Sequence, residues 1–131
     1  MESPDLRRRT MQAVKSKNTA PEMVVRRLLH GKGYRYRLHR RDLPGCPDLV
    51  FPSRRKIIFV HGCFWHGHDC PRGSRVPKSN TAYWLEKVAR NRERDFNSKQ
   101  RLKSNGWQVC TIWECQVKSP VIRKLEKFLT S

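Results

Sequence analysis

The densest concentration of reactive side chains lies in residues 60–70, which read VHGCFWHGHDC. This run holds three histidines, two cysteines, one aspartate and two adjacent aromatic residues. Imidazole and thiolate groups bind zinc, imidazole also transfers protons, and aromatic rings stack on nucleobases. One segment therefore predicts a metal site, a catalytic group and a nucleic-acid contact together.

The charge of the chain indicates a polyanionic partner. The 131 residues include 29 Lys and Arg against 11 Asp and Glu, which gives a formal net charge of +18. Such an excess is unusual for an enzyme of neutral metabolites and favours nucleic acid. The length suits one domain over residues 1–131, with residues 1–18 as a basic N-terminal arm.

The expected location is the cytoplasm, together with DNA. No apolar run approaches the roughly 20 residues of a membrane span, and the N-terminus lacks the apolar stretch of a secretory signal. Five cysteines, an odd number, argue against a disulfide framework and for metal binding or burial.

Hydrophobic spacing and turn residues predict an α/β fold, a mixed sheet covered by helices. Thr19 is expected to cap a first helix that ends at Gly31 or Gly33. The expected strands cover residues 34–38, 48–51, 56–60 and 107–113, the second and third as a hairpin. The expected later helices cover residues 80–105 and 120–129.

A zinc site is predicted from the spacing C-x4-H-x-C of Cys63, His68 and Cys70. The fourth ligand is expected to be Cys115, in the turn after the last strand, whereas Cys110 lies inside that strand and is expected to be a small core residue. A Cys3His set suits tetrahedral zinc in a closed structural site.

A second, hydrolytic site is predicted where the hairpin strands end. Asp48 offers the hard carboxylate oxygen that Mg²⁺ prefers, and the Val60 carbonyl is a further oxygen ligand. His61 and His66 flank this point, and a neutral imidazole can take a proton from an attacking water. His66 is left for this chemistry if the other four ligands complete the zinc shell.

Two acidic residues have alternative roles. Glu22, three residues after Thr19, either completes a capping box or accepts hydrogen bonds from metal-bound water. Asp95 shares a helix face with Trp84, Val88 and Asn91, and it either serves the site or forms an exposed pair with Arg92 or Lys99.

The adjacent rings of Phe64 and Trp65 are predicted to insert between base pairs, the alternative being that both belong to the core. Trp84 either joins this wedge or packs. A mispaired step costs less to open, so a wedge favours mismatched DNA. Phosphate contacts are expected from the basic runs at residues 7–9, 40–41, 54–56, 72–78 and 90–94.

Five motifs together resemble one family, the very short patch repair or Vsr-type endonucleases. They are SKNTAPE, LPGCPDLVF, IIFVHGCFWHGHDC, YWLEKVARNRERD and GWQVCTIWEC, and they span residues 16–115 in this order. The resemblance implies a restriction-endonuclease-like fold and Mg²⁺-dependent nicking of one strand 5′ to the thymine of a T:G mismatch. It further implies double-stranded mismatched DNA as partner, a monomer, and accessory mismatch-repair proteins.

The resemblance also implies a role for each matching residue. Asp48 and the Val60 carbonyl are similar to the magnesium ligands, although threonine often stands where this chain has Val60. His66 resembles the general base, and His61 the histidine that supports phosphate and transition-state charge. The remaining matches are the outer acidic residues Glu22 and Asp95, the zinc ligands Cys63, His68, Cys70 and Cys115, and the intercalating aromatics Phe64, Trp65 and Trp84.

The resulting hypothesis is a DNA mismatch endonuclease with catalytic Mg²⁺ and structural Zn²⁺. The rival hypothesis is a zinc-stabilised DNA-binding module without catalysis, in which Asp48, His66 and Asp95 are incidental. A product that requires Mg²⁺ favours the enzyme, and binding alone favours the module.

Overall fold

A computed structural model describes residues 19–63, 66–71, 74, 78–117 and 121–131. Within these residues the helices are α2 (Ala20–Gly31), α3 (Thr81–Ser104) and α4 (Val121–Thr130), close to the predicted bounds. The predicted basic arm and the two wedge residues Phe64 and Trp65 lie outside the described residues.

The described strands form one mixed sheet in the order β1-β2-β3-β4. Strands β1 (Arg37–Leu38), β2 (Leu49–Phe51) and β3 (Lys56–His61) pair antiparallel, and β4 (Gln108–Trp113) pairs parallel to β3. This arrangement confirms the predicted β2–β3 hairpin, which turns through a 3-10 helix at Pro52–Arg54.

The predicted first strand is too long at its N-terminal end. Pairing covers only Arg37–Leu38, because the preceding residues are used elsewhere. The Tyr34 N–H donates to the carbonyl of Leu29 at the end of α2, and the Tyr36 hydroxyl donates to the carbonyl of Arg26. These residues tie the chain to α2 instead of extending the sheet.

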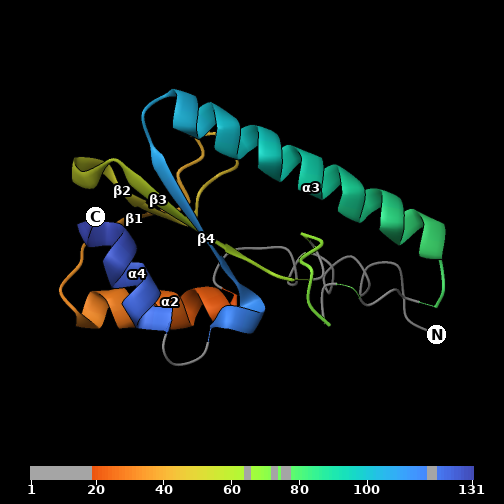
Figure 1. The fold of residues 1–131 in the computed structure, drawn as a ribbon, viewed down its shortest axis with the longest axis horizontal. Coiled ribbons are helices and arrows are strands. Elements are labelled where there is room, and N and C mark those ends of the chain that lie inside the picture. The colour runs from red at the N-terminus through yellow and green to blue at the C-terminus, as the bar shows by residue number, and fades with distance from the viewer. Residues whose placement is uncertain (1–18, 64–65, 72–73, 75–77, 118–120) are drawn as a thin grey trace.

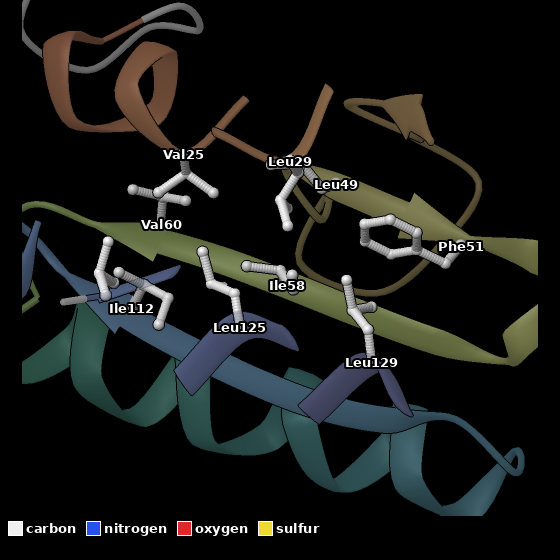
Figure 2. Packing of buried hydrophobic residues seen from close by; sticks show 10 residues of the cluster. Val25, Leu29, Leu49, Phe51, Ile58, Val60, Ile112, Leu125 and Leu129 are labelled. Atoms are coloured by element: carbon white, nitrogen blue, oxygen red, sulfur yellow. The ribbon is translucent and has the colours of Figure 1, made fainter. Parts of the chain in front are cut away.

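The helices cover both faces of the sheet (Figure 1): α3 lies on one face, and α2 and α4 lie on the other. Alternating residues of β3 supply both cores, because successive strand side chains point to opposite faces. Ile58 and Val60 pack with α2 and α4 (Figure 2), whereas Ile57 and Phe59 pack with Leu102 of α3. None of the helices in the described part of the chain is both long and apolar enough to cross a membrane.

The basic run between β2 and β3, expected to contact phosphates, instead holds the C-terminal helix. Lys56 is buried, and its Nζ donates to the carbonyls of Phe128 and Ser131 at 2.5 and 2.8 Å. Arg54 donates to the carbonyl of Leu129. Cations stabilise the free carbonyls at a helix C-terminus, so the phosphate assignment was wrong for buried Lys56, and it stays a prediction for the exposed Arg54.

Loss of core packing at α4 should lower stability. Leu125 is fully buried between α4 and the sheet, and Leu125→Ala should reduce the free energy of unfolding by about 2–5 kcal/mol in urea titrations. The control is Leu85→Ala on α3, because Leu85 is 55% exposed and its loss should cost less than about 0.5 kcal/mol. Equal effects of the two substitutions would contradict this packing.

Candidate active site and metal centre

The four predicted zinc ligands converge after the end of β3. One donor atom from each of Cys63, His68, Cys70 and Cys115 lies within 4.8 Å of all the others. The Cys115 Sγ and the His68 Nδ1 are 3.5 Å apart. Tetrahedral zinc with ordinary bond lengths separates a sulfur and a nitrogen ligand by about 3.6 Å, so the group has the dimensions of such a site.

The Cys63 thiol shows why this group suits a cation. Cys63 is buried, and burial raises the pKa of its thiol to about 12. Without a metal the sulfur therefore keeps its proton, and a bound cation is what would hold it as a thiolate. All the cysteines in the described residues are free thiols, as a metal site requires.

His66 lies outside this cluster and contacts the long helix. Its Nδ1 is 2.5 Å from the Oδ2 of Asp95 on α3. Because a carboxylate only accepts hydrogen bonds, the Nδ1–H donates to Asp95, and the neutral form of the ring then carries its lone pair on Nε2. The alternative of an exposed Asp95 paired only on its own helix is therefore wrong. The helix instead orients an imidazole whose free nitrogen can take up a proton.

His61 stacks on His66, with ring centroids 3.8 Å apart, and also on Phe59 of the same strand. Burial, with smaller effects of His66 and Lys99, lowers the pKa of His61 to about 2, so the ring is neutral. Its Nε2 is buried and has no hydrogen-bond partner among the residues that the structure describes. A buried polar atom without a partner is costly, and it marks a place where a ligand oxygen could bind.

Asp48 meets the end of β3, as the hairpin predicted. Its Oδ2 accepts from the Val60 N–H at 2.7 Å. The N–H and C=O of one strand residue point to the same edge of the strand, so the Val60 carbonyl faces the Asp48 side. The next residue is His61, which stacks on His66. The Asp48–Val60 contact and the pair of stacked histidines are therefore carried by consecutive residues at the end of β3.

Glu22 reaches this point from α2. Its backbone N–H donates to the Thr19 hydroxyl, which confirms the N-cap. Its side chain does not return to the cap; the Oε2 lies 2.8 Å from the His39 Nε2 and 3.4 Å from an Arg26 nitrogen. Donor atoms of Glu22, His39 and Asp48 lie within 4.8 Å of one another, so the carboxylate belongs to the Asp48 group.

The pKa of Asp48 is raised to about 7, mainly by burial and further by the neighbouring Glu22 carboxyl, and the hydrogen bond from the Val60 N–H opposes this rise. Two adjacent carboxylates repel each other, and a divalent cation relieves this repulsion. Carboxylate and carbonyl oxygens are the ligands that Mg²⁺ prefers. This side of the β3 end therefore has the chemistry of a hard-cation site.

Three residues of this region were assigned no role in the site from the sequence. His39 follows β1 in a loop, and its imidazole joins the acidic group only in the folded chain. Trp113 is the residue opposite His61, and its ring stacks on His68 at 4.2 Å and lies 5.4 Å from the His61 ring. Lys99 places its Nζ 5.8 Å from the Trp113 ring centroid and 6.0 Å from that of Phe59. Lys99 follows Asp95 by four residues on the helix, and this i, i+4 spacing is the sequence feature that could have placed Lys99 near the site.

Comparison with known proteins identifies the family. A family model described as DNA mismatch endonuclease Vsr matches residues 1–72. A Type II nicking enzyme of Xanthomonas oryzae, V.XorIIP, is 56% identical over 88% of this chain and 84% of its own. The chain belongs to the Vsr family. DNA mismatch endonuclease Vsr of Escherichia coli is 42% identical over 86% of this chain and 71% of its own, and a Neisseria meningitidis nicking enzyme, V.NmeAIP, is 43% identical over 86% and 79%.

Of the three aromatic residues of this Vsr-family chain that are expected to insert into DNA, Trp84 is the one that the structure describes, and it lies at the start of α3. Trp84 is partly buried, and its ring lies 5.0 Å from that of Tyr83 in an edge-on arrangement. The N-terminal half of α3 extends beyond the sheet (Figure 1), so both rings lie on a part of the helix that leaves the core. This position is compatible with either role considered for Trp84.

The raised pKa of Asp48 predicts a pH-dependent stability. A carboxyl group whose pKa is raised by folding binds its proton more tightly in the folded chain, so its ionisation destabilises that state as pH rises from about 4 to about 7. Asp48→Asn should therefore be more stable than the parent at about pH 8, on the order of 1–3 kcal/mol, and should lose this gain near pH 4.

Urea denaturation without added Mg²⁺ measures this difference. Asp42→Asn is the matched control, because the Arg40 guanidinium lowers the pKa of exposed Asp42, and removing that carboxylate should give no gain at high pH. The same gain at both pH values for Asp48→Asn would contradict the assigned shift.

Proposed function

We propose that this Vsr-family chain nicks one strand of double-stranded DNA 5′ to the thymine of a T:G mismatch, by Mg²⁺-dependent phosphodiester hydrolysis, in very short patch repair. The observation that carries the proposal is the contact between the His66 Nδ1 and Asp95 beside the buried, neutral His61. An imidazole oriented in this way serves proton transfer, which DNA binding alone does not require. The mixed sheet with helices on both faces supports a restriction-endonuclease-like single domain.

The residues present suit a magnesium ion. Asp48 and the Val60 carbonyl would bind it, and Glu22 would accept hydrogen bonds from its waters. When bound, Mg²⁺ supplies charge that polarises the phosphate and stabilises the leaving oxygen. The pair of adjacent carboxylates, with the raised pKa of Asp48, supports a cation at this position.

His66 would act as the general base. With its Nδ1–H held by Asp95, its Nε2 takes a proton from the attacking water, and the carboxylate stabilises the imidazolium that forms. His61 would donate its Nε2–H to a phosphate oxygen, as a neutral donor and not as a cation. Positive charge on this face would come from Lys99, beside the Phe59 and Trp113 rings.

The Cys3His cluster would hold structural Zn²⁺, which ties the loop after β3 to the turn after β4. Phe64, Trp65 and Trp84 would insert into the mismatched step, and the net charge of +18 supports contacts with DNA phosphates. We further propose that the chain acts as a monomer in the cytoplasm, in the same pathway as accessory mismatch-repair proteins.

Substitutions in the hydrolytic site should stop nicking without preventing binding. Asp48→Asn and His66→Ala should each lower the nicking rate of a T:G duplex by at least about 100-fold, since positioned acid–base groups contribute 10²–10⁴. His30→Ala on the exposed side of α2 is the control and should nick as the parent does. Denaturing gels with a strand-labelled duplex measure the product.

The same nicking assay distinguishes the proposed endonuclease from a DNA-binding module without catalysis. Binding of the T:G duplex without a Mg²⁺-dependent product in the parent chain would favour the module. Near-parental nicking by His66→Ala would reject the assigned base, and equal nicking of a T:A duplex would reject mismatch specificity.

Loss of a zinc ligand should remove the metal. We expect about one zinc per chain by elemental analysis, and Cys63→Ser should lose it and melt at a lower temperature, because ligand binding and folding are coupled. Cys46→Ser is the control, since exposed Cys46 lies outside the cluster and should leave the zinc content unchanged. Full zinc content in Cys63→Ser would contradict the assignment.

A further inference from the structure

His39 contacts both acidic residues of the proposed cation site. Its imidazole Nε2 lies 2.8 Å from the Oε2 of Glu22, a carboxylate that is 2% exposed. Its backbone N–H donates to the carbonyl of Asp48 at 3.1 Å. One residue thus links the helix that carries Glu22 to the strand end that carries Asp48.

The backbone of His39 is in a conformation that non-glycine residues adopt infrequently. Its φ of 48° lies in the left-handed region, where histidine is tolerated better than most side chains. This conformation directs the N–H toward Asp48 while the ring reaches α2. The local cost is offset by two hydrogen bonds, both of which involve the acidic residues.

The chemistry of the contact defines what the imidazole does. A carboxylate accepts and cannot donate, so the His39 Nε2–H donates to Glu22. Arg26 approaches the same Oε2 at 3.4 Å, and both donors therefore hold one oxygen of Glu22. Glu22 and Asp48 repel each other when both are ionised, and without these donors the Glu22 side chain would be free to turn away.

We propose that His39 is a positioning residue of the cation site, which donates its Nε2–H to Glu22 and so keeps that carboxylate directed toward Asp48. This inference rests on the proposed function, because it assigns His39 to the same site. In this role His39 acts through Glu22 and is not itself a ligand of the cation. Loss of a partner that orients a metal site typically weakens metal affinity by 10–100-fold.

The test compares His39→Leu, which removes the donor, with His39→Gln, whose amide N–H can replace it. Mn²⁺ binding by the zinc-loaded full chain is measured by electron paramagnetic resonance of the free ion, and nicking is measured over a range of Mg²⁺. His39→Leu should raise the Mn²⁺ Kd and the half-saturating Mg²⁺ by about tenfold or more, with the maximal rate largely retained at saturating Mg²⁺. His39→Gln should stay within about threefold of the parent, and the exposed control His30→Leu should not differ from it.

A double-substitution cycle tests whether His39 acts through Glu22. In the background of Glu22→Gln, His39→Leu should weaken Mn²⁺ binding no further. Parental Mn²⁺ affinity in His39→Leu, a full additional loss in the Glu22→Gln background, or a His39→Gln variant as weak as His39→Leu would each overturn the inference. The last of these outcomes would indicate that the imidazole itself binds the metal.

The same measurements distinguish an error in the proposed cation site from an error in the role of His39. If Asp48→Asn binds Mn²⁺ and nicks as the parent does, the proposed cation site is wrong, and the role of His39 is wrong with it. If Asp48→Asn loses both while His39→Leu keeps both, only the inference about His39 is rejected.

Discussion

The candidate metal and histidine groups of the described residues meet at the end of strand β3. The strand is buried along its length between two helical layers, so its register with β2 and β4 is strongly specified. Val60 binds Asp48, the following His61 stacks on His66, and Cys63 begins the metal cluster. A shift of β3 by one residue would exchange the two faces and separate all three groups.

The site combines an acidic interior with a strongly basic chain. Glu22, Asp48 and Asp95 converge on the end of β3 although acidic residues number 11 against 29 basic ones. In the proposed mechanism the surrounding positive charge would attract the DNA, and the local negative charge would bind the divalent cation. The basic and acidic residues would therefore serve different steps, the first the approach of the substrate and the second its hydrolysis.

The sequence predicted the elements of the fold and many of the convergent residues, because turn residues and the hairpin spacing specify which strand ends meet. It predicted the Cys3His group from local spacing, with Cys115 added from its place after a strand. It missed His39, whose contact with Glu22 depends on how α2 packs against the sheet. It also expected Lys56 to contact phosphates, because a lysine at the start of a strand gives no sign that a helix end will cover it.

Other differences have the same origin in tertiary contacts. Glu22 satisfied the local pattern of a capping box, but His39 and Arg26 hold its carboxylate away from the cap. Asp95 on its own helix could have paired with nearby cations, and it is the loop carrying His66 that gives it a partner. Helical periodicity predicts which face of a helix carries a side chain, but only the packed structure shows which residues that side chain contacts.

The indole of Trp113 connects the metal cluster to the histidine pair. Its ring stacks on that of His68, with centroids 4.2 Å apart, and its centroid lies 5.4 Å from that of His61 and 6.4 Å from that of His66. If the cluster holds zinc as proposed, loss of the ion would free His68 and so remove one neighbour of the indole. His66 would keep its contact with Asp95 and His61 its stacking on Phe59, so an empty cluster would loosen one wall around the two imidazoles and leave their other supports in place.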